Sequence, residues 1–202
     1  TEKLKVNCGL DLIHFSNGAF KLPNLGINNL TAKLGFAFKI GEEIISKSPD
    51  FNSEKGSWEH FLFSSFAVKE IKLKSGKKYG IYNLSSDGLK QISDKLVLGG
   101  GLDISYNSSL VPALADVDNN YTENKSDNLR MGVHGSFGLK IGRNYFLFQT
   151  GVYVRNKNNA LGSVYQRLVS RFAVTDKLFA SFSLKSHFAV ADYFEAGIGY
   201  KF

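Results

Sequence analysis

The stretch "NLRMGVHGSFGLKI", residues 128–141, decides the fold, because apolar and polar residues alternate along it. One set is apolar and the other is polar or small: Leu129, Met131, Val133, Phe137, Leu139 and Ile141 against Arg130, Gly132, His134, Ser136 and Lys140. An alternation with a period of two places these sets on opposite faces of a β-strand. The next residues, "IGRN", predict a tight turn into a second alternating stretch, "YFLFQTGVYV". The sequence therefore predicts an antiparallel hairpin with one apolar face.

The same alternation continues along most of the chain. Twenty glycines, seventeen phenylalanines and nine tyrosines, against three prolines and one tryptophan, also favour strands. Aromatic side chains fit a pleated surface, and glycines fit turns and bulges. We predict about ten strands, at Lys3–Ser16, Asn29–Ile40, Trp58–Leu73, Lys78–Leu84, Ile92–Tyr106, Asn128–Ile141, Asn144–Arg155, Leu161–Val174, Lys177–Phe188 and Asp192–Phe202. The expected fold class is all-β.

An antiparallel transmembrane β-barrel of the outer-membrane type explains three features of these strands. They are about 10 to 14 residues long, which suits tilted strands that span a bilayer. The expected inward rows are small or charged, as in a wet lumen. Short connections such as "VTDK" alternate with a long polar one at residues 107–127. We therefore expect residues 1–202 to form one barrel domain, or part of a larger barrel, with a soluble β-sandwich as the alternative.

The two ends of the chain set the expected orientation and location. The last strand is aromatic and ends in "GYKF", which resembles the final strand of bacterial outer-membrane proteins, whose C-terminus lies at the periplasmic end. Counting strands back from it makes the first strand ascend, so its end lies near the outer rim. No run reaches the roughly 18 apolar residues that a membrane helix requires. A strand pattern begins almost directly after Thr1, and we interpret the chain as a piece of a longer one.

Composition restricts the ligands. The single cysteine, Cys8, cannot form an internal disulfide, and no cysteine and histidine cluster has metal-ligand spacing. We expect no metal and no cofactor. The net charge of +7 favours an anionic partner, but the scattered lysines do not choose among nucleic acid, anionic lipid and lipopolysaccharide phosphate. Aromatic residues and lysines mostly occupy opposite faces, which disfavours a nucleic-acid-binding surface.

A histidine and a serine, His14 and Ser16, lie two residues apart at the end of the first predicted strand. Strand geometry places them on one face, about 6.5 to 7 Å apart along the backbone. A serine hydrolase needs a hydroxyl, a base, a group that holds the imidazole and donors for the oxyanion. The pair alone is weak support for such a site, because His-x-Ser is common and a polar strand end explains it more simply.

The other candidates have simpler interpretations. His60, His134 and His187 are interpreted as structural or solvated residues. The three glycines at 99–101 lack the following helix that a phosphate-binding loop requires, and they indicate strand curvature. Cys8 lies on an apolar face and is interpreted as a small hydrophobic residue.

The residues around the pair, "HFSNGAFKLPNLGIN" at 14–28, resemble the motif of the lipid A 3-O-deacylase (PagL) and bacterial acyloxyacyl hydrolase-like family. His-x-Ser-Asn is followed at matching spacing by Pro-Asn-x-Gly, and the resemblance covers roughly residues 9–40. The family consists of outer-membrane barrels that cut an ester-linked acyl chain from lipopolysaccharide. The resemblance implies that His14 is the general base, Ser16 the nucleophile and Asn24 an oxyanion donor. It gives Asn17 a supporting role in the turn or the site.

One position departs from the family pattern. The family's catalytic acid is a glutamate fourteen residues after the histidine, where this chain has Asn28. An amide can orient an imidazole, but it cannot stabilise an imidazolium as a carboxylate does. Asp11 is close in sequence but belongs to the opposite face. We therefore take Asn28 as the third member of the candidate site.

The candidate pair lies on the row expected to face lipid, where an acyl chain of the outer leaflet can reach it. The leading hypothesis is an outer-membrane serine esterase that acts on lipopolysaccharide, lipid A or a related outer-leaflet lipid. The alternative is a non-catalytic outer-membrane barrel that binds lipid or a protein partner. A soluble nucleic-acid-binding β domain is a third possibility, which the separation of aromatic and basic faces disfavours.

Overall fold

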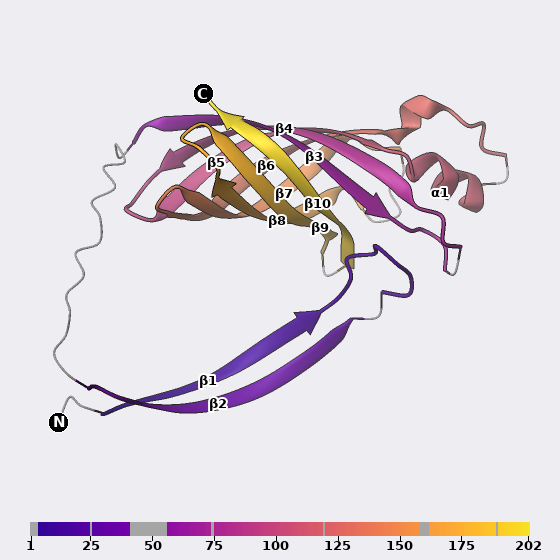
Figure 1. Cartoon of the computed structure of the whole chain (residues 1–202). Coiled ribbons are helices and arrows are strands. Elements are labelled where there is room, and N and C mark those ends of the chain that lie inside the picture. Colours follow the sequence, from indigo (N-terminus) through magenta and orange to yellow (C-terminus); the bar gives the residue numbers. More distant parts are fainter. Residues whose placement is uncertain are drawn as a thin grey trace. The chain divides into compact units, whose positions relative to one another are not determined.

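The computed structural model describes residues 4–24, 26–40, 56–73, 75–118, 120–157, 162–188 and 190–202. These residues form ten strands, one α-helix and one 3-10 helix (Figure 1). The strands are β1 (Leu4–Phe15), β2 (Ile27–Phe38), β3 (Trp58–Lys69), β4 (Tyr79–Gln91), β5 (Leu96–Asn107), β6 (Leu129–Ile141), β7 (Asn144–Arg155), β8 (Val164–Ala173), β9 (Leu178–His187) and β10 (Val190–Lys201). The α-helix is α1 (Leu110–Val117), and the 3-10 helix spans Lys125–Asn128.

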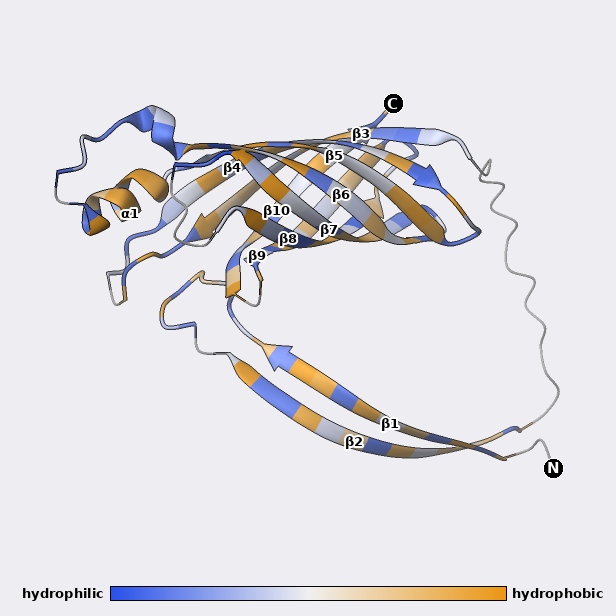
Figure 2. Cartoon of the chain, turned by 180° about the vertical axis from the view of Figure 1, so that it is seen from behind, coloured by the Kyte–Doolittle hydropathy of each residue, from blue (hydrophilic) through white to orange (hydrophobic). Residues whose placement is uncertain are grey.

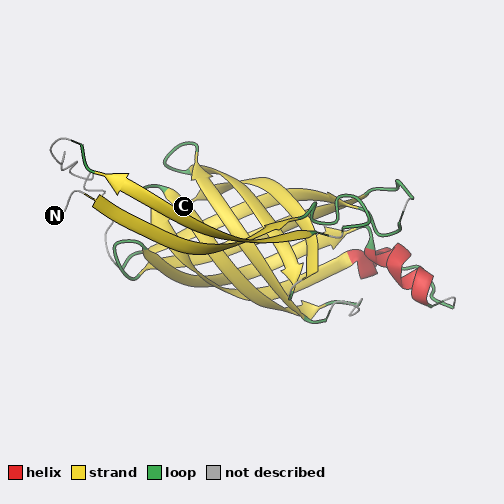
Figure 3. Cartoon of the chain, turned by 90° about the horizontal axis from the view of Figure 1, so that it is seen from below, coloured by secondary structure: helices red, strands yellow, loops and turns green. Residues whose placement is uncertain are grey.

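Eight of these strands close into an antiparallel barrel in the order β10-β3-β4-β5-β6-β7-β8-β9 (Figure 3). Within the barrel each strand pairs with its neighbour in sequence, and β10 pairs with β3 to close the ring. A closed barrel leaves no unpaired edge, which is the condition for a sheet to cross a bilayer. The predicted all-β barrel is confirmed.

The strands β1 and β2 form a two-stranded sheet of their own. The chain divides into two compact units, residues 1–17 with 24–52 and residues 18–23 with 53–202. This topology differs from the expectation of one barrel over residues 1–202, in which the first two strands were members. The physical reason is that alternation reports which face of a strand is apolar, but it does not specify the strand's pairing partner.

Alternation gives the barrel a polar lumen and an apolar exterior, visible as alternating colours along the strands (Figure 2). Phe137 of β6 and Phe148 of β7 belong to the exterior row and are 52% and 46% exposed. The lumen row buries charged side chains such as Asp87 and Arg171. This is the arrangement of transmembrane barrels, whose exterior meets lipid.

Paired charges fill the middle of the lumen. Arg167 Nη1 donates to Asp103 Oδ1 at 3.0 Å, and Arg171 donates to Asp87 Oδ2. His134 lies between the two carboxylates. Its position in the lumen agrees with the alternation, which placed it on the polar row. Buried charges are tolerated when they are paired and hydrogen-bonded. An apolar cluster packs in the same interior and consists of Phe61, Phe63, Leu89, Val97, Tyr145, Leu147, Val169 and Phe179.

One predicted strand is longer in the structure. The strand expected at residues 78–84 is β4, which continues to Gln91. Ser85 and Asp87 interrupt the apolar pattern and therefore resemble a loop in the sequence, but both are buried lumen residues. A hydrophilic lumen makes polar residues part of the strand rather than its end.

The connections mostly follow the predicted division into short and long. Those at 92–95, 142–143 and 174–177 are short, and the polar connection predicted at 107–127 contains α1. The proline of α1, Pro112, lies in the first turn, where a missing N–H costs little. The connection after β9, at 188–189, is also short.

No helix in the described part of the chain is long and apolar enough to cross a membrane.

Candidate functional site

The sheet of β1 and β2 has one apolar and one polar face. Leu12 pairs with Leu30 on the apolar face, and both side chains are 74% exposed. The polar face carries an ion pair in which Lys33 Nζ lies 3.0 Å from Asp11 Oδ1. Asp11 is therefore engaged on the face opposite to the candidate site, as the alternation predicted.

His14 and Asn28 lie directly opposite each other at the end of the apolar row. His14 Nδ1 donates a hydrogen bond to Asn28 Oδ1 over 2.6 Å. This bond places the ring proton on Nδ1 and leaves the lone pair on Nε2, which is the tautomer that a general base needs. Among the described residues, no hydrogen bond occupies Nε2 of His14.

The remaining site residues lie where β1 leads into β2. Ser16 is the first residue after β1 and is half-buried. Asn17 donates its backbone N–H to Asn24 Oδ1 at 3.0 Å, which ties the two ends of the connection together. Because the oxygen of this amide is the acceptor, Nδ2 carries the N–H groups that a developing oxyanion requires.

Comparison with known proteins assigns the family. The family model described as "Acyloxyacyl hydrolase, C-terminal domain" matches residues 56–202, which include the whole closed barrel. The chain belongs to this family. No curated protein sequence matches the chain. A solved structure described as "De novo design of transmembrane beta-barrels" is similar with a TM-score of 0.42 and 12% identity, over 74% of this chain and 98% of that one.

The match to the acyloxyacyl hydrolase family and the candidate site occupy different parts of the chain. The matched residues begin at Gly56, before β3. His14, Ser16 and Asn28 lie on or beside β1 and β2, outside the matched residues. Family membership therefore rests on the barrel, and the candidate site rests on the motif at residues 14–28 and on the geometry of the hairpin.

Gly26 lies against the imidazole of His14 in the candidate site, a role that was not predicted from the sequence. Its φ is +63°, and a Cβ built there would lie 2.7 Å from Cε1 of His14. Only glycine combines this left-handed backbone with such a close approach to the ring. The signal was present in the sequence, because Gly26 is the glycine of the Pro-Asn-x-Gly motif.

The other three histidines have partners of their own within the barrel unit. Both ring nitrogens of His134 face lumen carboxylates, at 2.6 Å and 3.0 Å. His187 is buried in the lumen, where Tyr153 contacts its Nε2 at 3.1 Å. His60 stacks against Trp58 with ring centroids 6.5 Å apart. In the described residues, no group of three or more histidine, cysteine, aspartate or glutamate side chains is arranged to hold a metal ion.

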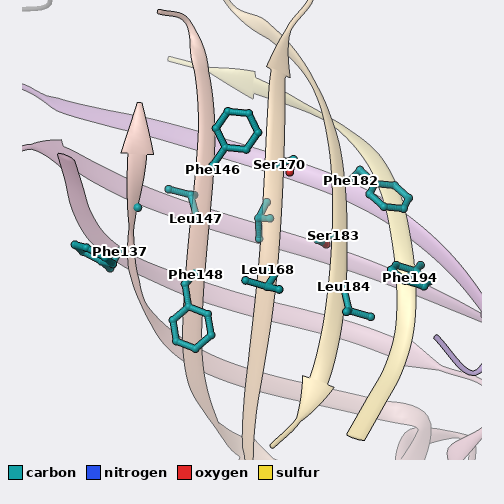
Figure 4. A pocket seen from close by; sticks show the side chains of 12 residues that line it. Phe137, Phe146, Leu147, Phe148, Leu168, Ser170, Phe182, Ser183, Leu184 and Phe194 are labelled. Carbon is teal, nitrogen blue, oxygen red and sulfur yellow. The ribbon is translucent and has the colours of Figure 1, made fainter. Parts of the chain in front are cut away.

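The exterior of the barrel carries an open groove of about 510 Å³ (Figure 4). Ser170 of β8 lies between Phe146 and Phe182 on the neighbouring strands, and its small side chain leaves the depression. Apart from Ser170 and Ser183, the side chains labelled in Figure 4 are aromatic or aliphatic. The groove is therefore lined mainly by apolar side chains.

Proposed function

We propose that this chain contains the nucleophile and base of an outer-membrane serine esterase, which removes an ester-linked acyl chain from lipopolysaccharide, lipid A or a related outer-leaflet lipid. The observation that carries the proposal is the 2.6 Å hydrogen bond from His14 Nδ1 to Asn28 Oδ1. It holds the imidazole in the tautomer of a general base, two residues before a serine. Membership of the acyloxyacyl hydrolase family supports the reaction class.

In the first half of the reaction, Ser16 Oγ attacks the carbonyl carbon of the ester. His14 Nε2 accepts the hydroxyl proton, and the C–O bond between Oγ and the carbonyl carbon forms. Asn24 Nδ2 and backbone N–H groups of the connection donate to the oxyanion. When the tetrahedral intermediate collapses, the imidazolium returns its proton to the leaving alkoxide of the lipid, and the acyl group stays on Ser16.

In the second half, water attacks the acyl group while His14 Nε2 takes its proton. Collapse of this second intermediate releases a fatty acid, and the proton on His14 restores the hydroxyl of Ser16. Asn28 orients the ring in both halves, but it carries no charge to offset the imidazolium. A carboxylate at this position would orient the ring and also offset the charge of the imidazolium. We therefore expect the wild-type chain to turn over more slowly than a variant with glutamate at position 28.

The position of the site favours a lipid substrate. His14 ends a row of exposed leucines, so an acyl chain that lies along this row brings its ester to the polar end. Polar groups are costly at lipid depth unless they bond one another or lie at the interface. The bond between His14 and Asn28 meets this condition. The net charge of +7 suits the phosphates of an anionic outer-leaflet lipid.

A membrane location sets a condition on the edges of the hairpin. In the described residues, β1 and β2 pair only with each other, so one edge of each strand is unpaired. Hydrocarbon tolerates a strand only where its backbone groups are hydrogen-bonded. The barrel of β3 to β10 is already closed, so it has no unpaired strand edge to offer to the hairpin.

Mass spectrometry of purified lipopolysaccharide, incubated with the full-length protein or its Ser16→Ala variant, tests the proposal. We expect the wild type to release one fatty acid and leave a lipid shorter by the corresponding acyl mass. The Ser16→Ala variant should leave the lipid intact while keeping the heat-modifiable gel migration of a folded barrel. Equal acyl release by both proteins would exclude Ser16 as the nucleophile, and no release by the wild type would favour the non-catalytic barrel that binds lipid or protein.

A further inference from the structure

The connection between β1 and β2 belongs to the compact unit of the barrel. Residues 18–23 group with residues 53–202, whereas the strands on either side of the connection do not. Gly18 is buried with a φ of +56°, and a Cβ there would lie 2.3 Å from the ring of Phe194 in β10. The chain therefore packs against the barrel directly after Asn17.

Glu70 makes two hydrogen bonds to this connection. It directly follows β3, and its side chain is only 2% exposed. Its backbone N–H donates to the carbonyl of Ala19 at 3.1 Å, and its Oε2 accepts the N–H of Leu22 at 2.9 Å. One residue thus holds the connection at two points, three residues apart.

The carboxylate of Glu70 is itself held from the barrel side. Its Oε1 accepts the N–H of Gly76 at 2.7 Å and the hydroxyl of Ser75 at 3.3 Å. Lys78 lies 3.9 Å from Oε2, donates to the carbonyl of Phe20 and places its ammonium 4.2 Å from the centre of the Phe20 ring. Both carboxylate oxygens therefore act as acceptors, a role that an amide can fill with only one atom.

We propose that Glu70 is a positioning residue for the esterase site. It fixes the connection to the barrel, and the connection joins Ser16, the nucleophile, to Asn24, the oxyanion donor. Glu70 touches no reacting atom and acts only through residues 18–23. The inference rests on the proposed esterase function, because it assigns Glu70 a role in that reaction.

The first test compares Glu70→Ala with Asp116→Ala in the full-length protein. Asp116 is also an acid of the barrel unit and pairs with Lys72 at 2.7 Å, but no described contact joins it to residues 18–23. We expect Glu70→Ala to lower kcat for acyl release by about 10- to 10²-fold, since small misplacements of catalytic groups have effects of this size. KM should stay unchanged, and Asp116→Ala should match the wild type. A wild-type kcat in Glu70→Ala overturns the proposal.

The second test holds the connection against the barrel with a disulfide in place of the carboxylate of Glu70. The backbone bond from Glu70 to Ala19 brings the two main chains together, so the pair Ala19→Cys and Glu70→Cys, in a Cys8→Ala background, suits a disulfide. We expect low kcat in the reduced protein and recovery of most of it on oxidation. This variant also decides the case in which Glu70→Ala does not fold. Equally low activity in both redox states would overturn the positioning role.

A third measurement separates this inference from the proposed function. Spin labels at Phe20→Cys and Ser86→Cys, in the Cys8→Ala background, report the distance from the connection to β4 without any turnover. A narrow distance distribution that broadens in Glu70→Ala supports the clamp even if the protein releases no fatty acid. An unchanged distribution overturns the clamp even if Ser16→Ala abolishes acyl release.

Discussion

Two His-x-Ser pairs occur in this chain, and the structure gives them opposite surroundings. His14 and Ser16 lie at the end of the exposed apolar face of β1. His134 and Ser136 have the same spacing in β6 but are buried in the barrel lumen. Sequence spacing alone therefore does not identify a nucleophile and its base.

The partners of each imidazole account for the difference. His14 is bonded by one neutral amide at Nδ1, which leaves Nε2 to accept a proton. His134 faces Asp103 at Nδ1 and Asp87 at Nε2, so both ring nitrogens are engaged with buried carboxylates. Ser136 in turn accepts a hydrogen bond from Gln149 at 3.1 Å. In the hairpin pair the Nε2 of His14 is left as an acceptor, whereas in the lumen pair both the imidazole and the serine are engaged in buried hydrogen bonds.

The largest contrast is expected between His14→Ala and His134→Ala. The first removes the proposed base and should lower acyl release by roughly 10³-fold or more, with little change in the urea midpoint of the barrel. The second leaves two buried carboxylates without their shared donor and should lower the free energy of unfolding by roughly 3 to 5 kcal/mol. The folded fraction of His134→Ala should keep its specific activity. The contrast fails if both variants lose activity to the same degree while folded.

A smaller change is expected at Asn28. Asn28→Ala removes the acceptor that fixes the ring of His14 and should lower the rate of acyl release roughly 10²-fold. Asn28→Glu should retain or raise the rate, because a carboxylate orients the ring and stabilises the imidazolium. Initial rates on purified lipopolysaccharide measure both effects. Wild-type turnover by Asn28→Ala would mean that another group, or none, holds the imidazole.

Gly26→Ala tests the close contact between the backbone at residue 26 and the imidazole of His14. The new methyl group would meet Cε1 of His14 at 2.7 Å, so the ring must shift, and we expect roughly a 10-fold loss of rate. Gly56→Ala is the matched control, because Gly56 also has a positive φ, +93°, but nothing lies within 4 Å of its added Cβ. Both variants should lose about 1 kcal/mol of stability from the strained backbone. Equal rates of acyl release in Gly26→Ala and Gly56→Ala would show that the contact with the ring of His14 does not affect the reaction.

The smallest expected effect is that of low pH on the contact between Glu70 and the connection at residues 18–23. The N–H of Leu22 holds the pKa of Glu70 below its usual value of 4.5. A carboxylate whose pKa is lowered by folding stabilises the folded state above its unfolded pKa, and this contribution is lost as the pH falls through the folded pKa. The label distance between Phe20→Cys and Ser86→Cys should therefore stay narrow at pH 5 and broaden only below pH 4.5. Broadening already at pH 6 would show that another group controls the connection.

The faces of the strands followed directly from the sequence, because alternation has a simple geometric cause. The prediction for residues 144–155 matches β7, and His134 was placed correctly in the lumen. The separation of β1 and β2 from the closed barrel was not predictable, because all ten strands alternate in the same way. The short prediction at residues 78–84 arose because lumen residues such as Asp87 find their partners on distant strands, 84 positions away in the case of Arg171.

The candidate site was predictable only in part. The motif indicated His14, Ser16, Asn24 and Asn28, and the structure brings His14 into contact with Asn28. Glu70 was assigned to the interior of a predicted strand that ends earlier, at Lys69. Its partner Leu22 is 48 residues away, and no local pattern encodes a contact at that distance.

We propose that Ser16, and not Ser136, is activated by the histidine two residues before it. A long-chain alkyl phosphonate that reacts with nucleophilic serines, followed by peptide mass spectrometry of the folded full-length protein, tests this claim directly. We expect the adduct on Ser16, its loss in His14→Ala, and no adduct on Ser136. Labelling of Ser136, or labelling of Ser16 that persists in His14→Ala, would contradict the account.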